Sequence, residues 1–581
     1  MDPVETPAPP HDPTSEWHSL VDGRMSRRKL LAGAAAAGVA AAVPLHLTTS
    51  RAAAAPSSHR GTVAPTTEDR LVLPRGFRAD LIAPWGSDIG GGLTAGFNHD
   101  WIGYYPIDLL ERGYDLSMPH RGFSPRRASS REGVLVINHE YTNPLFVSGY
   151  TTGTKTAEQI AAEQAAVGMS VVRVRRGRNG RWAVVTSDDT FARRIDATTP
   201  CVLTGPAATI DGGPQAVGSL ANCSGGQTPW GTALSCEENF AFFAQPAPAG
   251  DGWDPALYGR RHYGWVVEVD PWAPDAPPRK HTAMGRFRHE NVAIGVAPDR
   301  TVVAYMGDDL ADSCVYKFVA DRKLAKASDR EANLGILESG KLYVADFANG
   351  AWVLLDLAAH ARLRDAKDPV TGAPLFATQA DVLADARAAA LPVGGTPVDR
   401  PEDIEIDPRD GSVFVALTNN TGHGNFHGQI VRIIEEGGNP AATAFGWDIF
   451  AVGGPQSGFS SPDNLIFDGH GALWMVTDIS SSRVGKGIYA FQGNNALFMM
   501  PTRGKDAGTA YQFASGPVDC EMTGPAWTPD GETLFLSVQH PGELSTSATS
   551  PTSRWPNGGT DVPRPSSLAI TGPWDRFRSG R

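Results

Sequence analysis

One pattern recurs through this chain: a turn that carries Gly or Asp, a short strand of alternating apolar residues, and polar groups where the strand ends. Alternation with a period of two after an Asp-Gly type of turn is typical of β-hairpins. Most copies lie roughly 60–70 residues apart, which is the spacing of propeller blades that carry insertions. The pattern predicts an all-β chain folded as a single β-propeller, with inserted loops and short helices on one face. The strands end at Asn138-His139-Glu140, Glu237-Glu238-Asn239, Asp308-Asp309, Asp346, Asn419-Asn420, Asp478 and Gln539-His540.

Composition agrees with a turn-rich fold of low helical content. The 581 residues include 64 Gly and 45 Pro, which favour turns over helices. Two Ala-rich stretches, 156–168 and 379–390, carry apolar residues at helical spacing and are predicted as peripheral helices. A formal net charge of -12 argues against a nucleic-acid partner, because a protein that binds phosphate backbones needs a basic face.

The start of the chain has the features of an export signal. Arg27-Arg28 precedes a weakly apolar run, Leu30 to Leu47, that is too short and too mild to span a membrane. Small residues at Ala52 to Ala55 follow, where a signal peptidase could cut. These features predict a twin-arginine signal peptide over 1–55, recognised by the twin-arginine export machinery. The alternative is a chance arginine pair in front of an Ala-rich linker.

The remaining chain is predicted to form one domain outside the cytoplasm. This domain covers 56–581 and is expected in the periplasm, on the cell surface or in the medium. Within it, the stretch 541–572 is rich in Ser, Thr, Pro and Gly and is predicted as a long surface loop.

Carboxylates gather at the ends of the predicted strands. Equivalent strand ends lie on one face of a propeller, so these groups are expected to meet there. Adjacent acidic residues, as at Glu237-Glu238 and Asp308-Asp309, repel each other unless a cation lies between them. Turns by themselves also favour Asp and Asn, which is the simpler explanation for Asn419 and Asp478. Oxygen ligands indicate calcium, and a mixed Glu, Asp and His set also admits iron or manganese.

The densest polar run is 286–291. Arg288 and Glu290 share a face if this run is a strand. A guanidinium beside a metal-binding carboxylate suits a tetrahedral oxyanion, while the alternative is a structural ion pair between the two residues. The chain contains no GxSxG, HExxH, Walker A or GxGxxG motif, so no other catalytic scheme competes.

Several of these stretches, taken in order, resemble the PhoX family of alkaline phosphatases. The matching stretches run from about residue 70 to about residue 545, and each is modest alone but specific in series. They are 96–100, 138–141, 222–232, 235–239, 285–291, 307–318, 399–402, 521–525 and 539–543.

The resemblance implies a six-bladed propeller exported by the twin-arginine route. It implies a calcium- and iron-dependent phosphomonoesterase that acts on small-molecule phosphate esters, and we expect a monomer. Glu237, Glu238 and Glu290 match metal-ligand positions, and Arg288 matches the phosphate clamp, so that Arg288 and Glu290 are the expected catalytic residues. Asp399 is a further expected ligand, and local context adds Glu140 and Asp308.

The family's iron is bound by a cysteine thiolate, and the sequence leaves open which cysteine matches. This chain has five cysteines, none of them within 138–143. Cys223 and Cys236 are equally compatible with a structural role.

Two other functions fit the same pattern. Residues 461–465 resemble a blade of calcium-dependent propeller lactonases, which need no arginine clamp. A non-catalytic propeller with structural calcium is the third reading, because this fold hosts many functions.

Overall fold

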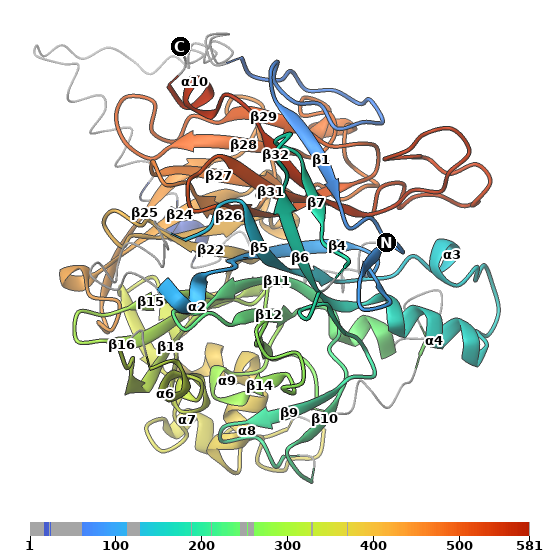
Figure 1. Cartoon of the computed structure of the whole chain (residues 1–581). Coiled ribbons are helices and arrows are strands. Elements are labelled where there is room, and N and C mark those ends of the chain that lie inside the picture. Colours follow the sequence, from blue (N-terminus) through green and yellow to red (C-terminus); the bar gives the residue numbers. More distant parts are fainter. Residues whose placement is uncertain are drawn as a thin grey trace, which may run out of the picture.

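The computed structural model describes residues 17–21, 24, 61–112, 128–187, 189–210, 212–244, 252–253, 261–326, 329–368 and 370–579. Six sheets of four to six strands radiate around one axis, which confirms the predicted six-bladed propeller (Figure 1). The first strand of each blade contacts the first strand of the next, in the closed order β4, β11, β15, β22, β26, β30 and back to β4. These inner strands form the wall of the central channel.

The first three blades contain most of the insertions. Blade one holds β4 (His99–Pro106), β5 (Glu132–His139), β6 (Gly168–Arg176), β7 (Trp182–Val184) and β8 (Arg193–Ile195). Blade two holds β11 (Asn222–Gln227), β12 (Ala233–Glu237), β13 (Val266–Val269), β14 (Arg279–His281), β9 (Pro200–Thr204) and β10 (Gln215–Val217). Blade three holds β15 (Ala293–Val296), β16 (Thr301–Gly307), β18 (Val315–Lys323), β19 (Gly340–Asp346) and β20 (Ala351–Leu354).

The last three blades are regular four-stranded sheets. Blade four holds β22 (Pro401–Ile406), β23 (Val413–Leu417), β24 (Gln429–Glu435) and β25 (Phe445–Val452). Blade five holds β26 (Pro462–Phe467), β27 (Ala472–Thr477), β28 (Ala496–Pro501) and β29 (Tyr511–Ser515). Blade six holds β30 (Glu521–Trp527), β31 (Thr533–Gln539), β32 (Ser566–Thr571) and β1 (Arg78–Ile82). Two small ladders, β2 (Asp88–Gly90) with β3 (Leu93–Thr94) and β17 (Ala311–Ser313) with β21 (Val398–Asp399), lie outside the blades.

All seven strands predicted from the repeat are present, and they account for six blades. Six of them, β5, β12, β16, β23, β27 and β31, are the second strands of the six blades. The seventh, β19, is the fourth strand of blade three, so it adds a copy of the pattern without adding a blade. This explains why one interval between copies is short.

The two ends of the described domain meet in blade six. β1 pairs antiparallel with β32, with Arg78 opposite Thr571 and Ile82 opposite Ser567, and the blue and red strands lie side by side in Figure 1. The stretch predicted as a surface loop over 541–572 therefore differs at its end, because all six residues of β32 are buried. The Ser- and Pro-rich composition of the stretch hides the short apolar core Leu568-Ala569-Ile570.

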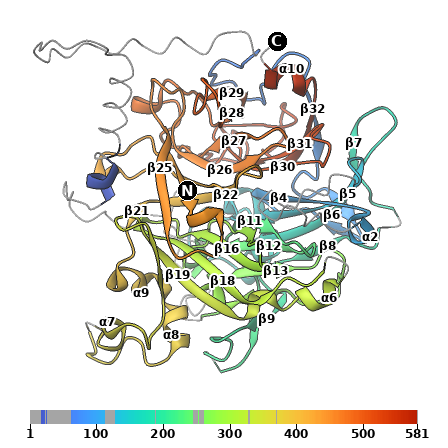
Figure 2. The same cartoon turned by 90° about the vertical axis from the view of Figure 1, so that its left-hand side faces the viewer.

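Helices are few and peripheral, as the sequence predicts. α4 (Ala157–Ala166) starts at a capping box formed by Thr156 and Gln159. The second predicted helix is divided at Asp385 into α8 (Gln379–Ala384) and α9 (Ala386–Val393), which pack with α7 (Ala361–Arg364) against blade three (Figure 2). The shorter helices are α2 (Leu109–Arg112), α3 (Pro144–Val147), α6 (Arg330–Asn333) and α10 (Trp574–Ser579).

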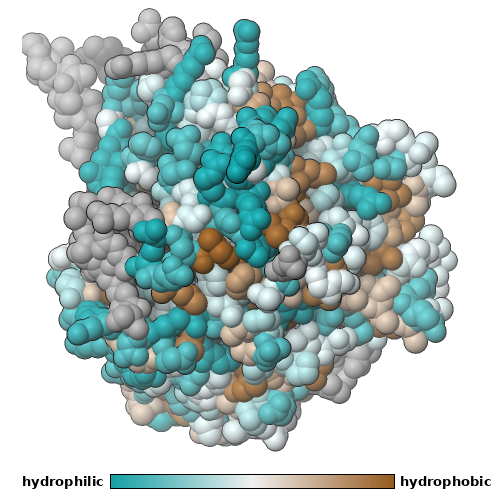
Figure 3. All heavy atoms as spheres, viewed as in Figure 1, coloured by the Kyte–Doolittle hydropathy of each residue, from teal (hydrophilic) through white to brown (hydrophobic). Residues whose placement is uncertain are grey.

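The surface is mixed in polarity. Hydrophobic residues on the face shown in Figure 3 are interrupted by hydrophilic ones. Among the described residues, no helix is long and apolar enough to cross a membrane.

A short helical segment at 17–21 packs on the propeller, although it lies within the predicted signal peptide. Trp17 is fully buried in the cluster that contains Phe347 and Trp447. Burial of this indole removes a large apolar area from water and stabilises the packing of the segment on the propeller. Arg27-Arg28 and the apolar run after them lie outside the described residues.

Candidate metal centre

Five of the six inner strands begin with the same local structure. A residue with positive φ comes first, and the residue two positions later carries a carboxylate or a thiol. A register shift in the pairing with the second strand follows, and such bulges re-aim side chains. Non-glycine residues rarely adopt positive φ, so the repetition marks a functional edge of the propeller. The pairs are Asn98 (φ 47°) and Asp100, Ala221 (φ 51°) and Cys223, Arg400 (φ 53°) and Glu402, Ser461 (φ 49°) and Asp463, and Asp519 (φ 54°) and Glu521.

The second strands end beside these starts, because the first two strands of each blade are antiparallel. Glu140 follows β5, Glu238 follows β12 and Asp309 comes shortly after β16. Glu290 comes shortly before β15 in blade three. The two sets of strand ends thus supply one group of acidic side chains, which we call the acidic centre. Its members are Asp100, Glu140, Cys223, Glu238, Glu290, Asp309, Glu402, Asp463 and Glu521.

Ligand atoms in the acidic centre converge in three overlapping groups. The first is Asp100, Glu140 and Cys223, the second is Cys223, Glu238 and Glu290, and the third is Glu290, Asp309 and Glu402. Within each group, one ligand atom per residue lies within 4.8 Å of the others. Cys223 and Glu290 each belong to two groups, so the arrangement fits several neighbouring cations with shared ligands.

Burial and mutual repulsion make this many carboxylates costly without a cation. Burial, the largest cause, raises the pKa of Asp100 to about 7 and that of Glu238 to about 8. Burial and the charge of Glu402 hold the pKa of Glu290 well above its usual range. The pKa values of Glu140 and Glu402 are raised in the same way. A bound cation would replace this repulsion with attraction, and its binding would release the protons.

Two buried carboxylate oxygens in the acidic centre indicate that its residues suit metal ions. Asp100 Oδ1 and Asp463 Oδ2 accept no hydrogen bond within the described part of the chain. Their partner oxygens are held by amides: Gln539 Nε2 donates to Asp100 Oδ2 at 2.8 Å, and Asn464 Nδ2 donates to Asp463 Oδ1 at 2.9 Å. Buried polar atoms without partners are rare, and orientation by outer hydrogen bonds is typical of metal ligands. The residues present therefore fit divalent or trivalent cations.

Two arginines lie at the centre. Arg400 is bound to it, donating to Asp309 Oδ1 at 2.9 Å and to Oδ2 at 2.7 Å, and it also lies 2.8 Å from Glu402 Oε1. Arg288 is half-buried, and its charge lowers the pKa of Glu238 against the effect of burial. No described carboxylate forms an ion pair with Arg288, so the alternative of a structural pair with Glu290 is not seen. Run 286–291 is also not a strand.

The structure brings three of the predicted metal ligands together and places three elsewhere. Glu140, Glu238 and Glu290 are in the acidic centre. Glu237 points to the other side of its strand end, where Oε1 accepts from Lys280 at 2.7 Å and Oε2 accepts from the backbone N–H of Gly264 at 3.0 Å. Adjacent side chains on a strand face opposite ways, so Glu238 and not Glu237 faces the other ligands.

The other two predicted ligands are satisfied in different surroundings. Asp308 is clamped by the guanidinium of Arg387 and accepts from Ser313 Oγ at 2.6 Å. Asp399 lies beside His423, 3.0 Å from its Nδ1, and accepts from Asn425 Nδ2 at 2.9 Å.

Sequence reasoning missed most of the residues on the inner strands. Asp100, Glu402 and Glu521 lie in stretches that carry the family resemblance, but the hairpin pattern points only to the ends of second strands. The sequence names Cys223 and leaves its role open. The signal that could have found them is a carboxylate or a cysteine at the first or second position of the strand, which five of the six inner strands have. Asp309 could have been predicted from the sequence, because it is adjacent to the predicted ligand Asp308.

Comparisons with known proteins show the family of the chain. The family model described as "Alkaline phosphatase PhoX" matches residues 58–542. The chain belongs to the PhoX alkaline phosphatase family. It is therefore a hydrolase that acts on phosphoric monoesters, as the resemblance predicts.

A solved structure of a PhoX protein is similar to this chain over most of its length. PhoX from Pseudomonas fluorescens, in complex with vanadate, is 31% identical, with a TM-score of 0.75, and the match covers 88% of this chain and 97% of that one. A protein described as a putative oxidoreductase (glucose dehydrogenase) from Thermus thermophilus is 12% identical, with a TM-score of 0.24 over 65% of this chain and 98% of that one, and nothing follows from a score so low. A comparison with curated protein sequences gives no match.

Proposed function

We propose that the chain is an exported alkaline phosphatase that releases phosphate from small phosphate esters with calcium and iron in its acidic centre. The observation that carries this proposal is the sharing of Cys223 and Glu290 between groups of converging ligands. A group of carboxylates alone, such as Glu290, Asp309 and Glu402, suits calcium. The two groups that include the Cys223 sulfur suit iron better, because a thiolate is a softer ligand.

The side chains around the metal ions have separate roles in substrate binding and in orienting the ligands. When bound, the metal ions supply positive charge that attracts a phosphate ester and stabilises the charge that develops on its oxygens. Arg288, next to Glu238, offers a two-pronged N–H donor to phosphate oxygens. Arg400 neutralises Asp309 and Glu402 and fixes their orientation. Gln539 ties blade six to blade one by donating to both Asp100 and Glu140.

A solved relative supports the proposal that a phosphate-like anion binds at the site. The Pseudomonas fluorescens protein was solved with vanadate, described as a transition state analogue. This supports an oxyanion of the size of phosphate at the matching site here. A site that reads phosphate and charge rather than the leaving group would accept many small esters. Export by the twin-arginine route, action as a monomer and a location outside the cytoplasm rest on the sequence, through the signal over 1–55.

The test is hydrolysis of p-nitrophenyl phosphate at alkaline pH by protein exported through its own signal, with metal analysis of the same sample. We expect calcium and iron in the protein, and loss of turnover on chelation. Calcium without iron and without turnover would contradict the proposal and favour structural calcium. Turnover of lactones that survives Arg288→Ala would favour the lactonase instead.

A further inference from the structure

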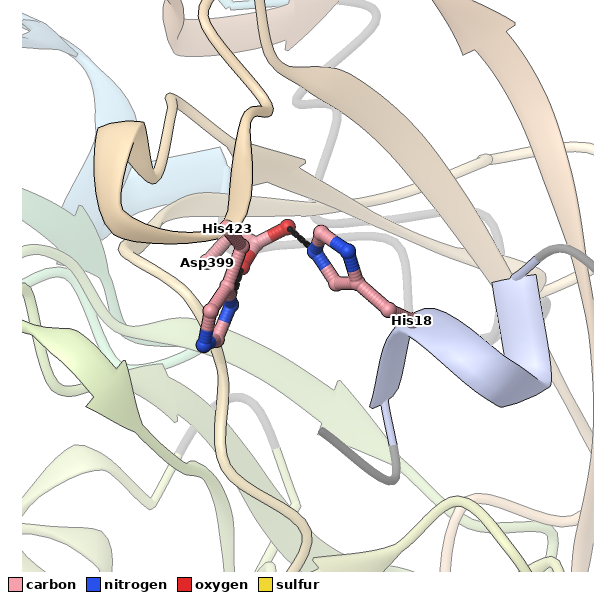
Figure 4. A group of neighbouring side chains, drawn as sticks. All are labelled: His18, Asp399 and His423. Carbon is pink, nitrogen blue, oxygen red and sulfur yellow. Dashed lines mark hydrogen bonds and ion pairs between the residues drawn. The ribbon is translucent and has the colours of Figure 1, made fainter. Parts of the chain in front are cut away.

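A second group of converging ligands lies outside the acidic centre. His18 comes from the helical segment 17–21, Asp399 from β21, and His423 from a 3-10 turn at Thr421–His423. Both imidazoles point to the carboxylate of Asp399, as Figure 4 shows. His18 Nε2 lies 3.5 Å from Asp399 Oδ2, and His423 Nδ1 lies 3.0 Å from Asp399 Oδ1. Unlike the acidic centre, this group is rich in imidazole.

The segment that carries His18 is held firmly on both sides of it. Trp17 is fully buried, stacks on Trp447 at 5.2 Å between ring centroids, and meets Phe347 edge-on at 5.2 Å. Arg24 lies 3.8 Å above the same Trp447 ring and donates to the Trp447 carbonyl at 2.8 Å. The segment is seen beside β25 in Figure 2. The contacts of Trp17 and Arg24 thus hold the segment that carries His18 against the propeller.

His423 lies between two carboxylates. Its Nδ1 is 3.0 Å from Asp399 Oδ1 and its Nε2 is 3.1 Å from Asp312 Oδ1, so a protonated ring donates to both. The Asn420 amide lies 3.2 Å from the same Asp312 oxygen and 3.0 Å from His423 Nδ1. A metal ion bound here would take the place of the proton between Nδ1 and Asp399, while the Nε2–H would still donate to Asp312.

The outer hydrogen bonds match those of known metal sites. A metal-binding histidine usually donates its other ring N–H to a carboxylate, which is the role of Asp312 here. Asp399 Oδ2 is oriented by Trp17 Nε1 at 3.2 Å and by Asn425 Nδ2 at 2.9 Å. Ligands at about 2.0–2.1 Å from a tetrahedral zinc ion lie about 3.4 Å apart. The separations are 3.0 Å from His423 to Asp399 Oδ1 and 3.5 Å from His18 to Asp399 Oδ2, on either side of that value.

We propose that His18, Asp399 and His423 bind a divalent transition-metal ion of the zinc type, which clips the N-terminal segment to the propeller. Two imidazoles and one carboxylate select zinc-like ions over calcium, so this site and the carboxylates of the acidic centre take different metals. Removal of a signal peptide over 1–55 would remove His18 with it. The clip is therefore a property of the chain before cleavage.

The experiment uses the full uncleaved chain, loaded with calcium and iron, and equilibrium dialysis against zinc. The wild type is expected to bind one zinc ion more than His18→Ala and His423→Ala, or to bind it at least tenfold more tightly. His360→Ala is the matched control, because His360 contacts only its own segment through the Leu354 carbonyl in the described structure and is expected to bind zinc like the wild type. Thermal unfolding of each variant without zinc checks that the propeller is intact.

A second readout follows the segment itself. Zinc is expected to slow tryptic cleavage after Arg24 in the wild type and to have no such effect in His18→Ala. Equal zinc binding by wild type and His18→Ala, together with equal cleavage rates, would overturn the proposal and leave Asp399 as a purely hydrogen-bonded anchor for Trp17. Neither readout depends on phosphatase activity.

Discussion

The sulfur of Cys223 lies 3.3 Å from both carboxylate oxygens of Glu290. Without a cation, burial and the nearby charge of Asp100 hold the pKa of this thiol well above its usual range. The thiol then donates to a carboxylate, whereas a metal ion would bind both groups deprotonated.

Replacement of Cys223 by Ser should remove iron selectively. We expect iron content and turnover to fall by at least tenfold with calcium largely retained, because a hydroxyl is a poorer ligand for iron than a thiolate. Metal analysis and p-nitrophenyl phosphate hydrolysis measure the two effects. Cys201→Ala is the control, since within the described residues the Cys201 thiol donates only to the carbonyls of Thr199 and Gly218. Unchanged iron in Cys223→Ser would show that the sulfur is no ligand.

The neighbours Glu237 and Glu238 should behave in opposite ways. Glu237→Gln leaves the fully buried ammonium of Lys280 without its counter-charge, and we expect a loss of about 3–5 kcal/mol in the free energy of unfolding. Metal content of the folded fraction should stay near the wild-type value. Chemical unfolding and metal analysis of the same preparation check both statements.

Glu238→Gln should lower metal content and turnover instead. Since the pKa of Glu238 is raised to about 8 in the metal-free chain, the neutral amide should not reduce the stability of that form at neutral pH. A loss of metal in Glu237→Gln but not in Glu238→Gln would reverse this assignment.

Arg288→Ala should raise the KM for phosphate esters and lower kcat/KM by at least tenfold, because a charged donor to the phosphate is lost. Metal content should not change, since no described carboxylate is paired with Arg288. The control is Arg286→Lys, whose parent guanidinium donates to the Tyr263 carbonyl at 2.7 Å and lies 4.7 Å from the Phe240 ring. Equal KM values for wild type and Arg288→Ala would exclude Arg288 as the phosphate clamp.

We expect Glu268 to make the free energy of unfolding depend on pH below pH 4.5. Burial alone would raise its pKa, but His281 Nε2 at 2.9 Å and the Arg279 guanidinium at 2.5 Å hold it at about 2. Because the folded pKa is below the unfolded value of 4.5, the charged form contributes stability above pH 4.5 that is lost as the pH falls toward 2. The size is about 3 kcal/mol, from about 1.4 kcal/mol for each pKa unit.

Unfolding of metal-free wild type and Glu268→Gln between pH 7 and pH 3 tests this. The difference in the free energy of unfolding between the two should be constant at neutral pH and shrink below pH 4.5. A difference that does not change with pH would show that the hydrogen bonds and not the charge of Glu268 stabilise the fold.

Sequence patterns predicted the second strand of every blade and could not predict the inner strands equally well. β5, for example, runs Val134-Leu135-Val136-Ile137 after a glycine turn, which is a strong local signal. β11, which carries Cys223, runs Asn222-Cys223-Ser224-Gly225-Gly226-Gln227 and has no apolar alternation at all. Its glycines are required by close approach, since a Cβ on Gly226 would lie 2.0 Å from the Val292 carbonyl oxygen. Such a strand is specified by its neighbours in space.

The same limit applies to adjacent carboxylates. The sequence predicts both Glu237 and Glu238 as metal ligands, but the register of β12 against β11 and β13 turns only Glu238 toward the acidic centre. Lys280, which binds Glu237, comes from β14, more than forty positions later. Asp308 and Asp309 are divided between Arg387 and Arg400 in the same manner.

The pairing of β1 with β32 also sets the order in which the protein can mature during synthesis. Asp100 and Glu140 are made early, whereas Gln539, which orients both of them, and Glu521 are made near the end. β1 cannot pair with β32, and blade six cannot be completed, until the ribosome has released the residues of β32. A nascent chain therefore holds an incomplete set of ligands, and cations that reach it before that moment meet only fragments of their final site.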